Sequence, residues 1–334
     1  MDVGAGLEMK AADTRPDVLP LLADDVVEAG HGAGPRAERH RVGREQLAAA
    51  GEVAGADGGL EDTEPLLGCR GGRSHGGIMH RDCGMLLVMP QSRRALRVLH
   101  TADIHLESDG YGDARQQAAH RERERRMFRS IVDRALHDQV DLVLIAGDLF
   151  DHNRVGDEAV AFVRGQLARL SQPVVILPGN HDVLRTNAIY DRHDFTAGAR
   201  HVHLIRRLDG ETIELPELDA VVWGRAMEEH EPGFQPLANI PGRDARRWCL
   251  GMGHGFFYQD RQRPDRSSPI FADEIRDTGW DYLALGHQHV QTNVSQGDVT
   301  AYYAGAPGTV LRIDLSVDGR IRVAPRPLEY DSIA

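Results

Sequence analysis

Residues 141–151 read Asp-Leu-Val-Leu-Ile-Ala-Gly-Asp-Leu-Phe-Asp, a continuous apolar run that ends in a glycine and two carboxylates. Apolar runs of this kind are typical of strands that are buried on both faces of a parallel sheet. The run Pro-Val-Val-Ile-Leu at 173–177 and the shorter run Arg-Val-Leu-His at 97–100 have the same character. We therefore expect three buried strands, each followed by polar residues.

Two amphipathic segments separate these strands. The segment 114–137 carries apolar residues at helical spacing beside a charged face, and the segment 157–170 repeats this pattern. Strands and helices that alternate in this way form βαβ units, which predicts an α/β fold with a mainly parallel sheet. Beyond residue 200 the pattern favours further strands, at 201–206, 211–215, 219–224, 247–253, 281–286, 300–304, 309–315 and 320–324.

Carboxylate, amide and imidazole side chains follow five of the expected strands. They are Asp103 and His105, Asp148 and Asp151, Asn180 and His181, His254, and His287 and His289. The carboxyl ends of strands in α/β sheets are where ligands bind, so we expect these groups to converge. The remaining histidines, among them His201 and His230, are interpreted as structural.

The residue types in this set suit a dinuclear metal centre. Carboxylate oxygens and imidazoles together bind Mn, Fe or Zn, and one carboxylate can bridge two ions that lie about 3.5–4 Å apart. The pairs Asp-x-His and His-x-His place both side chains on one side of an extended segment. Glycines stand directly before Asp148, Asn180, His254 and His287, where we expect tight turns.

Five stretches carry a family resemblance: Val-Leu-His-Thr-Ala-Asp-Ile-His-Leu at 98–106, Ala-Gly-Asp-Leu-Phe-Asp at 146–151, Leu-Pro-Gly-Asn-His-Asp at 177–182, Asp-Tyr-Leu-Ala-Leu-Gly-His-Gln-His at 281–289 and Tyr-Ala-Gly-Ala-Pro at 303–307. With them the chain resembles the calcineurin-like metallophosphoesterase superfamily over about 95–325, and most closely its SbcD-type DNA repair exonuclease subunits. The resemblance implies an α/β/β/α sandwich of two mixed sheets flanked by helices. It also implies a phosphoester hydrolase with two divalent metal ions, Mn first and Fe or Zn as alternatives.

The resemblance also assigns roles to individual residues. Asp103, His105, Asp148 and His289 would hold the first metal; Asp148, Asn180, His254 and His287 would hold the second, with Asp148 bridging. His181 would act as the general acid at the leaving oxygen, and Asp151 would fix its tautomer. His152 and Arg154 are candidate phosphate contacts, although exposed loop residues of this kind are commonly only solvated.

Residues 1–88 differ from the rest of the chain. They are rich in Gly and Ala and have no sustained apolar period, so we expect a disordered or non-native extension ahead of a catalytic domain at 89–334. No signal peptide and no apolar run long enough to span a membrane is expected. Three cysteines in 334 residues favour a reducing compartment and a cytoplasmic location.

Two functions remain open at this point. The first is a DNA exonuclease or endonuclease of SbcD type, for which the resemblance implies DNA as substrate and a coiled-coil ATPase of SbcC type as partner. The second is a stand-alone phosphodiesterase acting on a small nucleotide or another non-DNA phosphodiester. The net charge of −12 and an aromatic content of 5% argue against a broad single-strand binding track, which favours the second. A non-catalytic scaffold is disfavoured because every expected ligand is present.

Overall fold

The computed structural model describes residues 93–110, 112–262, 264–306 and 309–328. The chain divides into two units, 1–81 and 82–334, and all described residues belong to the second. The predicted N-terminal extension, 1–88, lies outside the described residues. None of the helices in the described ranges has the length and apolar character needed to cross a bilayer.

The first sheet contains the three strands expected from the sequence. Its strand order is β14-β13-β1-β2-β3-β4, in which β1 to β4 run parallel and β13 pairs antiparallel with both β1 and β14. The strands are β1 (Leu96–Thr101), β2 (Leu142–Ala146), β3 (Val174–Leu177), β4 (Val202–Leu204), β13 (Thr309–Leu315) and β14 (Ile321–Pro327).

The second sheet has the order β11-β12-β10-β7-β6-β5, and its four central strands, β12, β10, β7 and β6, are parallel. The edge strands β5 and β11 pair antiparallel with their neighbours, so both sheets are mixed. The strands are β5 (Glu211–Leu215), β6 (Ala220–Gly224), β7 (Trp248–His254), β10 (Tyr282–Gly286), β11 (Thr292–Asn293) and β12 (Thr300–Tyr303). A separate parallel pair consists of β8 (Phe256–Tyr258) and β9 (Pro269–Phe271).

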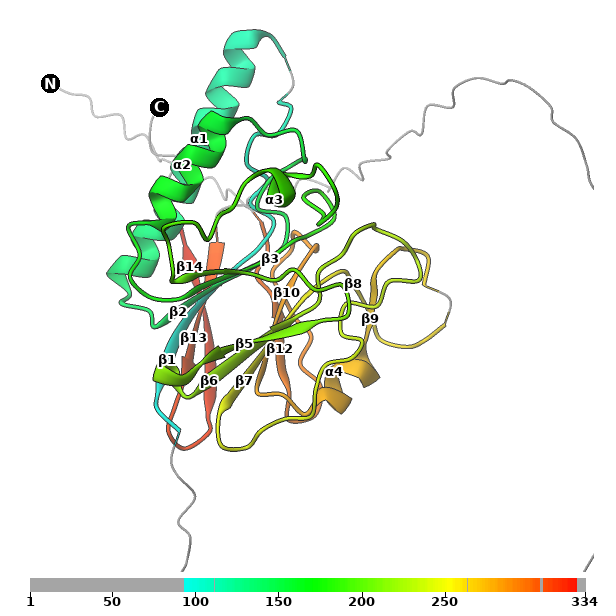
Figure 1. The fold of residues 1–334 in the computed structure, drawn as a ribbon. Coiled ribbons are helices and arrows are strands. Elements are labelled where there is room, and N and C mark those ends of the chain that lie inside the picture. Colours follow the sequence, from blue (N-terminus) through cyan, green and yellow to red (C-terminus); the bar gives the residue numbers. More distant parts are fainter. Residues whose placement is uncertain (1–92, 111, 263, 307–308, 329–334) are drawn as a thin grey trace, which may run out of the picture. The chain divides into compact units, whose positions relative to one another are not determined.

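Alternation along the strands sorts their side chains into layers. In β2, Leu142 and Leu144 face the second sheet, whereas Val143 and Ile145 face the helices. Strand β10 behaves in the same way, since Tyr282 packs between the sheets and its neighbour packs on the outer face. The predicted α/β/β/α sandwich of two mixed sheets flanked by helices is therefore confirmed (Figure 1).

Helices cover the outer faces of the two sheets. Helix α1 (Ala114–His137) begins at a capping box in which the Asp113 carboxylate accepts from the main chain of Gln116, and its apolar side packs on the first sheet beside α2 (Asp157–Leu167). The short α4 (Ala272–Thr278) buries Ile275 against the second sheet. The remaining short helices are α3 (Ile189–Arg192) and the 3₁₀ turn η1 (Pro216–Leu218).

The observed elements match the expected ones closely where the sequence pattern is long. Helix α1 has the expected bounds, and α2 ends at Leu167, three residues earlier than expected. The elements that were not expected are short: α3, α4, β8, β9 and β11. Segments of two to seven residues do not contain enough periods for a helical or alternating pattern to stand out.

Candidate metal centre

The candidate residues lie at the carboxyl ends of central strands from both sheets. Asp103 and His105 follow β1, Asp148 follows β2, and Asn180 and His181 follow β3 of the first sheet; His254 ends β7, and His287 and His289 follow β10 of the second. Because β2 lies against β7 and β10, the two sets of loops meet at one end of the sandwich. The structure thus brings all the predicted ligands together.

Asp103, His105 and His289 form one group, whose ligand atoms all lie within 4.8 Å of one another. The Nε2 atoms of His105 and His289 are 3.3 Å apart, so both imidazoles face the same point. The Asp103 carboxylate is buried and accepts from the main-chain N–H of His287 at 2.9 and 3.0 Å. This hydrogen bond ties the loop after β1 to the loop after β10.

Asp148, His254 and His287 form a second group within the same 4.8 Å limit. Asn180 Oδ1 lies 2.9 Å from His254 Nε2 and 2.7 Å from His287 Nδ1, which adds an amide oxygen to this group. Asp148 Oδ2 lies 3.2 Å from His254 Nε2 and 3.8 Å from His105 Nε2. The Asp148 carboxylate therefore stands between the two groups.

Buried charges shift the pKa values of this cluster in opposite directions. Burial alone would raise the pKa of the Asp148 carboxyl, but His254 and His105 hold it well below its usual value. Burial would lower the pKa of His254, but Asp148 and Asp103 raise it to about 9. Burial and the nearby His254 lower the pKa of His287 to about 3. A bound cation would compete with the proton on His254, since imidazoles bind metals in their neutral form.

The main chain at the site adopts conformations that non-glycine residues rarely take. The φ angles of Asp103, His105 and Asp148 are 52°, 51° and 51°, and that of His287 is 96°. Left-handed conformations of this kind typically cost about 1–3 kcal/mol each and persist where the surroundings enforce them. They turn the chain sharply at the strand ends, so that consecutive side chains reach the same point.

Two glycines permit the close approach of the loops. Gly147 has a φ of 95°, and a Cβ there would collide with the imidazole of His254. Gly179 does not have a positive φ; a Cβ on it would collide with the Asp148 carboxylate. The sequence interpretation explained both by tight turns, whereas Gly179 is needed for the distance between the loops after β2 and β3.

His181 and Asp151 lie at the edge of the first group. His181 Nδ1 lies 2.7 Å from the main-chain carbonyl of Asp151 and 3.5 Å from its carboxylate, whereas that carboxylate lies 3.0 Å from His105 Nδ1. The carbonyl of Asp151 thus makes the closer contact with His181, and its carboxylate orients His105. Nitrogen atoms of His181 and His105 and a carboxylate oxygen of Asp148 also lie within 4.8 Å of one another, so geometry alone offers His181 to a cation as well.

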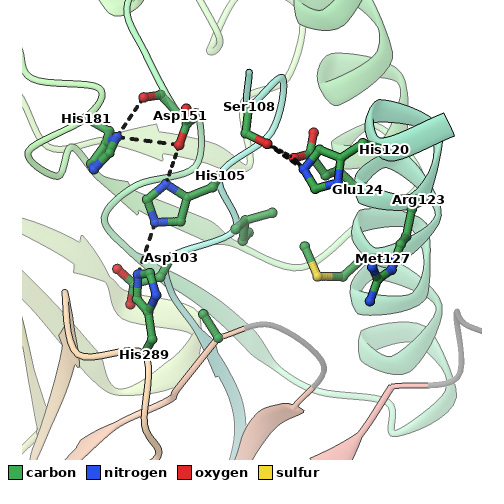
Figure 2. Close-up of a pocket in the computed structure, with 12 residues that line it drawn as sticks. Asp103, His105, Ser108, His120, Arg123, Glu124, Met127, Asp151, His181 and His289 are labelled. Atoms are coloured by element: carbon green, nitrogen blue, oxygen red, sulfur yellow. Dashed lines mark hydrogen bonds and ion pairs between the residues drawn. The ribbon is translucent and has the colours of Figure 1, made fainter. Parts of the chain in front are cut away.

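His152 and Arg154 line a hollow of about 320 Å³ on the Asn180 side of the centre, together with His181, Arg185, Glu228, Glu229 and His230. On the opposite side, a hollow of about 390 Å³ separates the Asp103 group from α1, and His181 lines this one too (Figure 2). His181 therefore stands between the two hollows.

The sequence interpretation overlooked two residues at the site. His230, which was interpreted as structural, lines the first of these hollows, and its ring centroid lies 5.2 Å from that of His287. No motif surrounds it that could have indicated this position. Asp182 was included in a quoted motif without a role, although its position directly after Asn180 and His181 was a usable signal.

Asp182 connects the loops after β2 and β3. Its side chain is fully buried and accepts from the main-chain N–H groups of Leu149 (3.0 Å), Phe150 (3.2 Å) and Gly179 (2.7 Å), and from the Tyr190 hydroxyl (2.7 Å). Burial and the nearby Asp148 nevertheless raise the pKa of this carboxyl to about 6. Asp182 thereby fixes the positions of Asp148 and Asn180 relative to each other.

A family model described as calcineurin-like phosphoesterase matches residues 96–291. The chain belongs to this family. The donors described above, carboxylate and amide oxygens with imidazole nitrogens in two groups around Asp148, fit the divalent ions that such phosphoesterases bind.

Relatives within this phosphoesterase family include components of nucleases. The chain is 26% identical over 232 residues to the uncharacterized metallophosphoesterase YhaO of Bacillus subtilis, covering 63% of this chain and 52% of that protein. It is 40% identical over 269 residues to the DNA double-strand break repair protein Mre11 of Aeropyrum pernix, covering 69% and 62%. It is 33% identical over 254 residues to the SbcD component of the nuclease SbcCD of Escherichia coli K12, covering 64% and 60%. The chain thus spans between 52% and 62% of the length of these relatives.

Replacement of Asp148 should be the most damaging single change at this centre. We expect Asp148→Asn to lower the metal content of manganese-loaded protein and to reduce phosphodiester hydrolysis at least about 100-fold, because one charge faces both ligand groups. Metal analysis and turnover of bis-p-nitrophenyl phosphate measure the two effects. The control Asp133→Asn changes an exposed carboxylate paired with Arg169 and should alter neither. Full metal content with near-normal turnover in Asp148→Asn would rule out a bridging role.

Asp182→Asn should destabilise the fold by about 1–3 kcal/mol, because the amide turns an N–H toward buried donors. Tyr190→Phe is the matched control, since it removes one of the four hydrogen bonds and should cost only about 1 kcal/mol. Urea unfolding of the chelator-treated proteins gives both values. An equal loss in the two variants would mean that the main-chain contacts of Asp182 contribute nothing measurable.

Proposed function

We propose that this phosphoesterase hydrolyses phosphodiester bonds in DNA as an exonuclease or endonuclease of SbcD type. The observation that carries the proposal is the position of Asp148, which lies between two groups of donors while His181 stands at their edge between two hollows. A phosphodiester has a substituent on each side of the phosphate, and hollows on both sides of His181 suit such a substrate better than a monoester.

Two divalent ions, manganese in the first place with iron or zinc as alternatives, are proposed to bind at the two groups. Asp103, His105 and His289 would hold one, Asn180, His254 and His287 the other, and Asp148 both. When bound, such a pair polarises the phosphate and stabilises the charge on the attacking and leaving oxygens. The side chains of this chain orient the ions: Asp151 fixes the ring of His105, and the carbonyl of Ala146 lies 2.9 Å from His254 Nδ1.

His181 is proposed as the general acid. Its Nδ1 faces the Asp151 carbonyl, a pure acceptor, so Nδ1 carries a hydrogen and Nε2 is the atom that can deliver a proton to the leaving oxygen. His152 and Arg154 are proposed to contact the phosphate backbone from the hollow that they line. A DNA substrate would agree with the names of two relatives, and with them we propose a coiled-coil ATPase of SbcC type as partner and a cytoplasmic location.

The second candidate is a phosphodiesterase that acts on a small nucleotide or another non-DNA phosphodiester. Residues 89–334 hold 30 Lys plus Arg against 36 Asp plus Glu, which leaves a net charge of −6 for this part. Glu228 and Glu229 stand beside Arg154 and Arg185 in the second hollow. An acidic surface weakens the general attraction of a DNA backbone, which would favour a small substrate.

Parallel assays of the full chain distinguish these candidates. With manganese present, we expect hydrolysis of duplex DNA, of single-stranded DNA and of bis-p-nitrophenyl phosphate, and we expect a chelator to abolish all three. Hydrolysis of the nitrophenyl ester without cleavage of either DNA would support the small-substrate alternative. Failure on every substrate at full metal occupancy would contradict phosphodiesterase activity itself.

His181→Asn should separate chemistry from metal binding. We expect the variant to keep its metal and to lose about 10²–10⁴-fold in rate on DNA, whose alkoxide leaving group needs a proton. The loss on bis-p-nitrophenyl phosphate should be smaller, because nitrophenolate leaves without protonation. Metal analysis beside kinetics on both substrates measures this, with the exposed His137→Asn as control. Loss of metal would make His181 a ligand, and equal losses on both substrates would remove the acid role.

A further inference from the structure

The hollow between the Asp103 group and α1 has two chemically different walls (Figure 2). One wall carries the reacting groups, with Asp103, His105, His181 and His289; the other is the inward side of α1, with His120, Arg123, Glu124 and Met127. Its volume of about 390 Å³ is within the range of small-molecule sites. A group attached to a phosphate at the metal centre would therefore enter a defined space.

A hydrogen-bond network organises the α1 wall. His120 Nε2 lies 2.7 Å from Ser108 Oγ and 3.0 Å from Glu124 Oε1, and the Ser108 hydroxyl also contacts the Glu124 carboxylate. The other oxygen of Glu124 accepts from the main-chain N–H of Glu107 at 3.0 Å. Glu124 is 8% exposed, which is rare for a glutamate without a specific partner. The network holds the His120 ring in one orientation at the hollow.

Local stability does not account for His120 in this network. Ser108 and the Glu107 main chain already contact Glu124, so the buried carboxylate has partners without the imidazole. The side chain of His120 remains 41% exposed, and it contributes little apolar burial. Its place on the wall of a hollow that also contains the reacting groups is better explained by a ligand.

The lining favours a neutral group with both apolar and polar surface. Ile104, Met127 and Ala306 supply apolar contact, and His120 supplies a hydrogen-bonding ring. Two carboxylates beyond the metal-ligand group, Glu124 and Asp151, line the space with a single guanidinium, that of Arg123, so a second phosphate gains little there. A sugar with its base has this mixed character, and a flat ring can pack on Met127.

We propose that this hollow is a nucleoside subsite, in which His120, positioned by Ser108 and Glu124, contacts the sugar or base attached to the scissile phosphate. The inference rests on the proposed phosphodiesterase function and adds to it the location of one substituent. His120 is the contacting residue, and Glu124 and Ser108 act through it.

The test compares esters that share a leaving group and a reacting phosphate. The substrates are the p-nitrophenyl esters of thymidine 5′-phosphate, of thymidine 3′-phosphate and of methyl phosphate. We expect the full chain with manganese to prefer at least one thymidine ester over the methyl ester in kcat/KM. In His120→Ala this preference should fall about tenfold, the effect of one lost hydrogen bond of ordinary strength. His120→Gln, which keeps a polar group, should restore part of it, and the exposed His137→Ala on the same helix is the control.

Calorimetric binding of thymidine 5′- and 3′-monophosphates and of methyl phosphate provides a readout without turnover, and melting temperature and metal content check that His120→Ala is folded and loaded. Weaker binding of either thymidine phosphate in His120→Ala supports the subsite even if no diester is hydrolysed, an outcome that would contradict only the proposed function. Hydrolysis of all three esters with equal efficiency, and equal changes in His120→Ala, would overturn the subsite while leaving phosphodiesterase activity intact.

Discussion

The contact between Asp148 and His254 is the point on which the site depends. Asp148 follows a strand of the first sheet and His254 ends a strand of the second, and their side chains approach to 3.2 Å. Neither sheet alone contains a complete set of donors. The face-to-face packing of the sheets, through residues such as Leu144 and Met252, therefore determines the distance between the two halves of the metal centre. A change in that core would act on the site without touching any ligand.

The fold could be predicted to a large extent because its central strands have unambiguous patterns. The runs that became β1, β2 and β3 are continuous and apolar, and α1 contains enough turns for its periodicity to be read over its full length. The candidate site could be predicted for a related reason. Its residues directly follow those strands, and strand ends in α/β sheets converge whatever the details of packing.

The remaining features depend on contacts between residues far apart in the sequence. His230 reaches the centre from a loop without regular structure, and no local pattern distinguishes it from a structural histidine. Ser108, His120 and Glu124 are separated by helical turns and a loop, so only the packing of α1 shows that they meet. The contact of His181 with the carbonyl of Asp151 could not be predicted from residue types, because every residue has a carbonyl.

The place of β13 in the first sheet has a consequence for biosynthesis. This strand lies between β14 and β1, and Val98 pairs with Ile313, although β1 is the first described strand to leave the ribosome. During translation one edge of β1 therefore stays unpaired until almost all of the described chain has been made. Pairings between such distant segments form slowly and leave strand edges open to wrong partners in the meantime. Nascent chains of this protein should consequently depend on protection of that edge by a chaperone until β13 becomes available.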